Sequence, residues 1–123
     1  MKKELLNTFD KELLLKDICA RLPYGVKIQV PYEDGSGYFD EIVWEVSNDG
    51  PFYVNGWGIE YEYVKPYLFP LSSITKKTLE ELSAYIDIKN AYVAVEFFNS
   101  HHIDYRGLIE KGLAIDATGL DIY

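Results

Sequence analysis

The chain has 123 residues, of which 48% are hydrophobic and 26% are charged, and its formal net charge is −8. This length and composition suit a single folded domain over residues 1–123 and exclude a disordered chain. No run reaches the roughly 20 apolar residues that span a bilayer, and no secretion signal opens the sequence. The single cysteine excludes an internal disulfide, so we expect a cytoplasmic protein without membrane contact.

The first predicted element is a helix from about Phe9 to Leu22. Leu14, Ile18 and Leu22 recur at the spacing of one helix face, which indicates an apolar stripe turned towards a core. Cys19 falls within the same pattern, and we expect it to be a small buried side chain.

The middle of the chain predicts an antiparallel meander of three or four strands, because short alternating segments are separated by strong turn signals. The predicted strands are residues 26–30, 40–47, 52–54 and 59–64. In the second of them, Ile42 and Trp44 share one face, and Glu41 and Glu45 share the other.

The C-terminal half is predicted to be mainly helical. Pro66 and Pro70 push their predecessors into extended geometry, which predicts a stiff connector over residues 65–70. Thr75 is a natural N-cap for a helix that ends near Asp87. Residues 90–100 fit a buried helix or a core strand, and we favour the helix. The fold class is therefore α+β: an N-terminal helix, the meander, two C-terminal helices and an irregular tail broken by glycines.

The negative charge is concentrated in one third of the chain. Residues 28–64 contain no Lys or Arg, whereas the rest of the chain has equal numbers of basic and acidic residues. The eight acids of this window are Glu33, Asp34, Asp40, Glu41, Glu45, Asp49, Glu60 and Glu62. The window also holds nine aromatic residues: Tyr32, Tyr38, Phe39, Trp44, Phe52, Tyr53, Trp57, Tyr61 and Tyr63.

An acidic and aromatic surface attracts cations and repels phosphates, so we expect no direct binding to nucleic acid. The same acids also fit a solvated sheet face that keeps the protein soluble and discourages edge pairing. Both interpretations remain open from the sequence.

The familiar catalytic motifs are absent: the sequence has no nucleophile elbow, P-loop, dinucleotide fingerprint, CxxC pair or HExxH helix. His101, His102 and Asp104 are the one local cluster of reactive side chains. Adjacent histidines diverge on a helix and face opposite ways on a strand, so they fit structural histidines better than a shared metal site. We expect no metal and no cofactor, and we expect Arg106 to pair with Asp104 or with a carboxylate on a helix.

Two stretches, Lys65–Thr75 and Asp104–Asp116, together resemble short proteins of Bacteroides-type gut bacteria and of their phages and mobile elements. A looser match covers Cys19–Val26. This family of proteins has no assigned activity, so the resemblance implies a biological setting and no site.

The function expected from the sequence is a small non-enzymatic binding module that presents an acidic aromatic β-surface to a basic protein. The residues expected to contact the partner are Glu41, Glu45, Trp57, Glu60, Tyr61, Glu62 and Tyr63. One alternative is a small-ligand-binding protein or enzyme with a pocket near His101, His102 and Asp104, and another is a structural accessory protein. The oligomeric state stays open.

Overall fold

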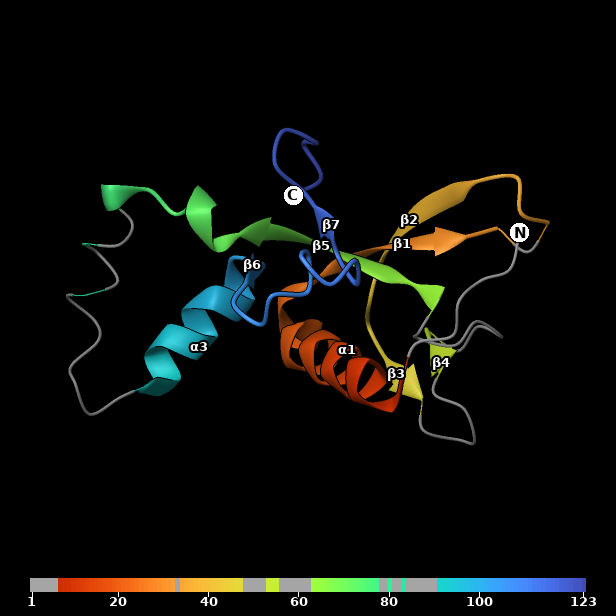
Figure 1. Cartoon of the computed structure of the whole chain (residues 1–123), viewed down its shortest axis with the longest axis horizontal. Coiled ribbons are helices and arrows are strands. Elements are labelled where there is room, and N and C mark those ends of the chain that lie inside the picture. Colours follow the sequence, from red (N-terminus) through yellow and green to blue (C-terminus); the bar gives the residue numbers. More distant parts are fainter. Residues whose placement is uncertain are drawn as a thin grey trace.

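The computed structural model describes residues 7–32, 34–47, 53–55, 63–77, 80, 83 and 91–123. The described elements form an α+β fold with helices packed beneath a mixed sheet (Figure 1), which confirms the predicted class. The helices with complete bounds are α1 (Thr8–Arg21) and α3 (Ala91–Ser100). The strands are β1 (Lys27–Pro31), β2 (Tyr38–Ile42), β3 (Val46–Ser47), β4 (Tyr53–Val54), β5 (Lys65–Pro70), β6 (Ile103–Asp104) and β7 (Ile115–Asp116).

Five strands form one sheet with the order β2-β1-β5-β6, and β7 also pairs with β5. β1 is antiparallel to β2 and β5, whereas β6 and β7 run parallel to β5. β3 and β4 form a separate antiparallel pair. The prediction of a purely antiparallel meander was therefore wrong, because short strands from the C-terminal segment join the sheet in parallel.

Helix α1 forms where the apolar spacing predicts it. The Asn7 side chain caps its first turn by accepting a hydrogen bond from the Asp10 N–H at 2.8 Å. Leu14 and Ile18 are buried against the sheet. Cys19 is exposed, so the expectation that it is buried was wrong: it lies about 100° around the helix from Ile18, away from the buried stripe.

The second predicted strand, residues 40–47, is divided in the structure. β2 ends at Ile42, and β3 begins at Val46. The burial at this break is the opposite of the predicted one: Val43 is 1% exposed, whereas Ile42 and Trp44 on either side are 48% and 56% exposed. The predicted apolar face of Ile42 and Trp44 is thus a solvent face.

The stretch predicted as a connector is a central strand, β5. Pro66 lies opposite Ile28 of β1. The backbone groups of Ile28 point towards β2, because hydrogen-bonded pairs alternate along an antiparallel ladder. The β1–β5 ladder therefore requires no N–H from Pro66, and proline is accommodated in the interior of the sheet.

Residues 91–100 form helix α3, as favoured, but the helix is not buried as predicted, because Val95 and Glu96 are exposed. A two-residue turn follows Ser100 and leads into the two-residue strand β6. The tail is less irregular than predicted, because β6 and β7 both pair with β5. The Phe69 N–H donates to the His102 carbonyl, and the Ala117 N–H donates to the Leu68 carbonyl, both at 2.8 Å.

Two predicted elements fall largely outside the described residues. Of the helix predicted over 75–87, the described residues Lys76, Lys77, Glu80 and Ser83 are helical. Of the strand predicted over 59–64, only Tyr63 and Val64 are described, and neither is in a strand.

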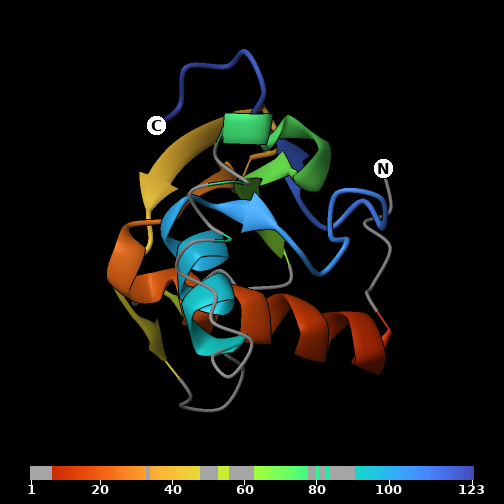
Figure 2. The ribbon, with the colours of Figure 1, turned by 90° about the vertical axis from the view of Figure 1, so that its left-hand side faces the viewer.

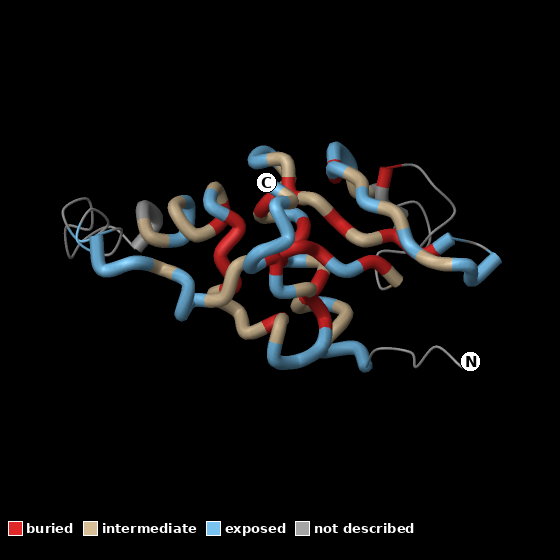
Figure 3. The backbone as a smooth tube through the Cα atoms, turned by 90° about the horizontal axis from the view of Figure 1, so that it is seen from above, coloured by how far each residue is buried: buried red, intermediate tan, exposed pale blue. Residues whose placement is uncertain are grey.

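The core lies between α1 and the lower face of the sheet. Leu14 and Ile18 pack with Ile28 and Val30 of β1 and with Leu68 of β5. Seen along the molecule's long axis, α1 and α3 lie below the five-stranded sheet, and the C-terminal segment lies above it (Figure 2). Buried residues gather along the middle of the molecule, and the β1–β2 hairpin reaches outwards (Figure 3).

Candidate functional site

A cluster of exposed aromatic and acidic side chains lies along β2, the outermost strand in the sheet order. Tyr38 is 63% exposed, and Ile42 and Trp44 are about half exposed. The exposed carboxylate Asp40 lies between Tyr38 and Ile42 in the sequence, and the exposed carboxylate Glu45 directly follows Trp44. We refer to Tyr38, Asp40, Ile42, Trp44 and Glu45 as the β2 edge.

Strand alternation explains why three of these residues share one side of the sheet. Tyr38, Asp40 and Ile42 are spaced two apart, so their side chains point to the same face. Phe39 and Glu41 point to the other face, where Phe39 packs against the core. The pleat of β2 therefore separates a solvated face from a half-buried one.

A buried asparagine fixes the end of the β2 edge. The Asn55 amide donates to the Ile42 carbonyl at 2.8 Å, and its Oδ1 accepts from the N–H groups of Trp44 at 2.9 Å and Glu45 at 3.3 Å. Its own N–H donates to the Glu45 carbonyl at 3.0 Å. Asn55 has φ of 56°, a left-handed conformation that asparagine tolerates better than most residues. These bonds hold the backbone of Trp44 and Glu45 in place after the strand has ended.

Asp40 is positioned by the sheet. The Tyr67 hydroxyl donates to Asp40 Oδ1, and the Gln29 side chain donates to the Tyr67 hydroxyl at 3.3 Å. Burial, followed by the hydrogen bond to Asp40, raises the pKa of Tyr67 to about 12. Tyr67 therefore remains a donor at neutral pH, and it orients the Asp40 carboxylate on the solvated face.

The charges around the β2 edge are predominantly negative. At the hairpin tip, hydrogen bonds from Ser36 lower the pKa of Asp34. Lys27 lies opposite Ile42 in the β1–β2 register, but its ammonium donates to the Ile122 carbonyl. The exposed carboxylates of the β2 edge make no ion pair among the described residues.

The structure separates the residues predicted to contact a partner. Glu45 is exposed within the β2 edge, whereas Glu41 is half-buried on the opposite face of β2. Tyr63 is half-buried and precedes β5. The remaining four, Trp57, Glu60, Tyr61 and Glu62, lie outside the described residues.

Four residues of the β2 edge were not predicted as site residues: Tyr38, Asp40, Ile42 and Trp44. The predicted strand began at Asp40, which left out Tyr38, and Ile42 and Trp44 were grouped on the apolar face. The available signal was the pattern of Tyr38, Asp40 and Ile42 directly after a glycine-rich turn.

The predicted cluster of His101, His102 and Asp104 does not converge on one point. His101 is exposed, and its Nδ1 lies 3.0 Å from the Phe97 carbonyl. His102 is buried, with its ring stacked on Tyr123 at 3.9 Å between centroids. Both carboxylate oxygens of Asp104 accept backbone hydrogen bonds, from Leu108 and Ile109, each at 2.9 Å. Asp104 thus fixes a turn.

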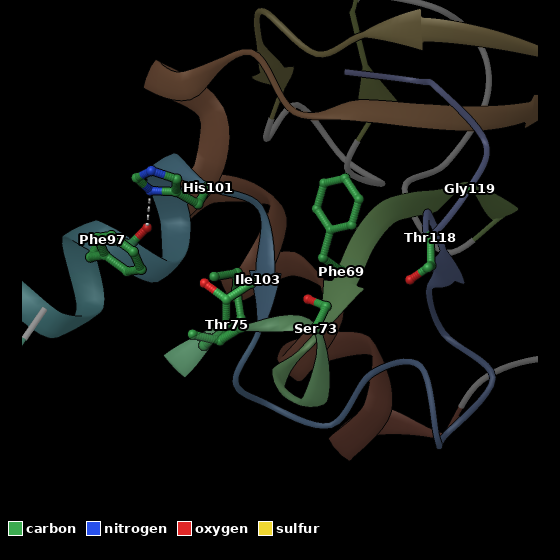
Figure 4. A pocket seen from close by; sticks show the side chains of 9 residues that line it. Phe69, Ser73, Thr75, Phe97, His101, Ile103, Thr118 and Gly119 are labelled. Atoms are coloured by element: carbon green, nitrogen blue, oxygen red, sulfur yellow. Dashed lines mark hydrogen bonds between the residues drawn. The ribbon is translucent and has the colours of Figure 1, made fainter. Parts of the chain in front are cut away.

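A cavity of about 430 Å³ lies beside His101, between the end of β5 and α3 (Figure 4). Phe69 and Phe97 stand on its walls, and the hydroxyl residues Ser73 and Thr118 lie at its margin. His101 stacks on Phe97 at 4.2 Å. His102 and Asp104 do not line the cavity, so the structure places only one of the three predicted residues there.

Arg106 pairs with a helix carboxylate, as predicted. Its Nη1 lies 2.7 Å from Asp17 Oδ1, and Asp17 also accepts two hydrogen bonds from Arg21, at 2.9 and 3.1 Å. Arg21 and Asp17 are fully buried. Arg21 also donates to the carbonyls of Phe98 and Ile103, which joins α1 to the end of α3 and to β6. This is a structural ion network.

Among the residues that the structure describes, no group of three His, Cys, Asp or Glu side chains is placed to hold a metal ion. In the same residues, no helix is long and apolar enough to cross a membrane. Comparisons with protein-family models, with curated proteins and with solved structures find no match to this chain. The functional conclusion therefore rests on the site itself.

Proposed function

We propose that this chain is a small non-enzymatic binding module that presents the β2 edge to a basic partner protein. The observation that carries the proposal is the exposure of Tyr38 and Trp44 beside the carboxylates of Asp40 and Glu45. Aromatic side chains supply much of the contact energy in protein interfaces, and complementary charge directs association and selects the partner. An acidic aromatic edge therefore fits a surface rich in Lys and Arg.

The proposal includes the setting that the sequence resemblance implies. A protein encoded by a phage or mobile element could act by covering a nucleic-acid-binding surface of a host factor. Such a surface is basic because it neutralises phosphates. The acidic charge of residues 28–64 is suited to occupying it.

Binding of a small apolar ligand is a second candidate function, supported by the cavity between Phe69 and Phe97. Its volume lies within the range of about 300–1,000 Å³ that is usual for ligand sites. No Asp, Glu, Lys or Arg side chain lines it, so its ligand would be held by apolar contact and by hydrogen bonds to groups such as Thr118.

The protein-binding proposal is tested by capture from host-cell lysate with four forms of the chain. The first is wild type, and the second is Tyr38→Ala/Trp44→Ala, which removes the exposed rings. The third is Asp40→Asn/Glu45→Gln, which removes two carboxylates from the β2 edge. The control is Glu12→Gln/Glu110→Gln, which removes two exposed carboxylates elsewhere and has the same net charge as the third.

We expect a specific partner to be retained by wild type and by the control, and to be reduced at least about tenfold by either edge variant. Retention should also weaken between about 0.05 and about 0.5 M salt, because exposed charges are screened. Equal retention by all four forms would refute the proposal. Equal loss of the partner by the third form and by the control would show that net charge determines binding and that the β2 edge does not.

A further inference from the structure

The register of β1 and β2 shows which backbone groups of β2 face outwards. The Val43 N–H donates to the Val26 carbonyl at 3.0 Å, and the Tyr32 N–H donates to the Gly37 carbonyl at 2.9 Å. Hydrogen-bonded and non-hydrogen-bonded pairs alternate along an antiparallel ladder. Phe39 and Glu41 therefore bond to β1.

The backbone groups of Tyr38, Asp40 and Ile42 point away from β1. The Asn55 amide bonded to the Ile42 carbonyl supports this direction, because Asn55 lies outside the β1–β2 ladder. Within the described chain, no strand pairs with the outward N–H and C=O groups of Tyr38 and Asp40. These outward groups lie two residues apart, as on any free strand edge, and an extended peptide can pair with such an edge as a new strand.

A second copy of this chain is a poor occupant of this edge. In the fully overlapped antiparallel pairing of two β2 strands, Asp40 would lie directly opposite Asp40, and like charges directly opposite one another destabilise a sheet. Each copy also carries a net charge of −8. The charge therefore favours a partner of opposite sign.

We infer that the partner supplies an extended segment that adds antiparallel to the outer edge of β2. This inference rests on the proposed function. Directly opposed side chains share a face and interact. The residues opposite Glu41 and Asp40 are therefore basic, and those opposite Ile42 and Tyr38 are apolar. Read from its N-terminus, the segment has the pattern apolar, basic, basic, any residue, apolar.

The test uses the peptide acetyl-Thr-Val-Lys-Arg-Val-Val-Thr-amide, which places its arginine opposite Asp40 and its last valine opposite Tyr38. One derivative is N-methylated at the arginine and at the last valine, whose N–H groups would donate to β2. The matched derivative is N-methylated at the lysine and at the middle valine, whose N–H groups would face away. All three peptides have the same side chains and charge.

Affinities are measured by calorimetry against the complete chain. We expect the outward-methylated peptide to retain binding within about threefold and the inward-methylated peptide to bind at least about tenfold more weakly, because two hydrogen bonds are lost. Asp40→Asn should weaken the unmodified peptide, and Glu12→Gln should not.

Equal binding by the two methylated peptides overturns strand addition and leaves the proposed function standing, because side-chain contacts alone would then hold the partner. Failure of the unmodified peptide to bind also overturns the inference. The proposed function is then decided by the capture experiment, whose variants do not depend on how the partner's backbone is arranged.

Discussion

His102 occupies an unusual position for a histidine. It is buried, it has φ of 56°, and its Nδ1 has no hydrogen-bond partner among the described residues. Burial, and then the positive charge of Arg21, lower the pKa of His102 from 6.5 to about 4. The folded protein therefore holds His102 neutral at a pH where the unfolded chain protonates it.

This pKa difference predicts a loss of stability in mild acid. As pH falls from about 6.5 to about 4, His102 is protonated in the unfolded state and stays neutral in the folded state. The free energy of unfolding should therefore fall by up to about 3 kcal/mol. Urea unfolding at several pH values checks this for wild type and for His102→Asn, which tolerates the left-handed backbone.

The variant should lose most of the pH dependence in this interval, and His101→Asn should keep it, because His101 is exposed. Parallel profiles for wild type and His102→Asn would show that another group is responsible.

At the level of single residues, sequence patterns indicated the kind of partner that a side chain needs and not which residue supplies it. The pairing of Arg106 with a helix carboxylate could be predicted, because a lone arginine near the core needs an acidic partner. That this partner is Asp17 depends on packing between segments 89 residues apart, which a single sequence does not encode visibly. No local sequence pattern indicates the hydrogen bonds between the Asn55 side chain and the backbone of Ile42 and Trp44.

At the level of elements, the buried ion network joins the two halves of the chain. Asp17 of α1 lies between two guanidinium groups, and Arg21 extends the contact to the carbonyls of Phe98 and Ile103. A buried charge that loses its partner is costly, so this network should be sensitive to substitution at its centre.

Asp17→Asn should lower the free energy of unfolding by about 3–5 kcal/mol, because it leaves the buried guanidinium of Arg21 without a counter-charge. Glu12→Gln on the exposed side of α1 should change it by less than about 0.5 kcal/mol. Chemical denaturation of both variants measures the difference. A change of less than about 1 kcal/mol for Asp17→Asn would show that water or neighbouring groups replace the carboxylate.

The elements that sequence predicted best were those with a strong local period. The apolar stripe of α1 and the alternation of β1 each specify an element without reference to the rest of the chain. β5 was missed because Pro66 and Pro70 normally argue against an interior strand, and only the register with β1 shows that no N–H is needed there. β6 and β7 are two residues each, too short for a periodic signal.

For the whole molecule, the central feature is that the two faces of the sheet differ in their role. One face packs on α1 and forms the core, and the other carries Tyr38, Asp40 and Ile42 of the β2 edge. The charge asymmetry was readable from residues 28–64. Its placement on an outer strand was not, because it depends on which strands pair.

The central claim, that the β2 edge is the binding surface, is tested most directly by amide-resolved NMR of the uniformly labelled chain during titration with the heptapeptide. We expect the largest shift changes at residues 38–45, with Tyr38 and Asp40 among them. Changes centred on Phe69, Phe97 and His101, or changes of similar size over the whole surface, would contradict it.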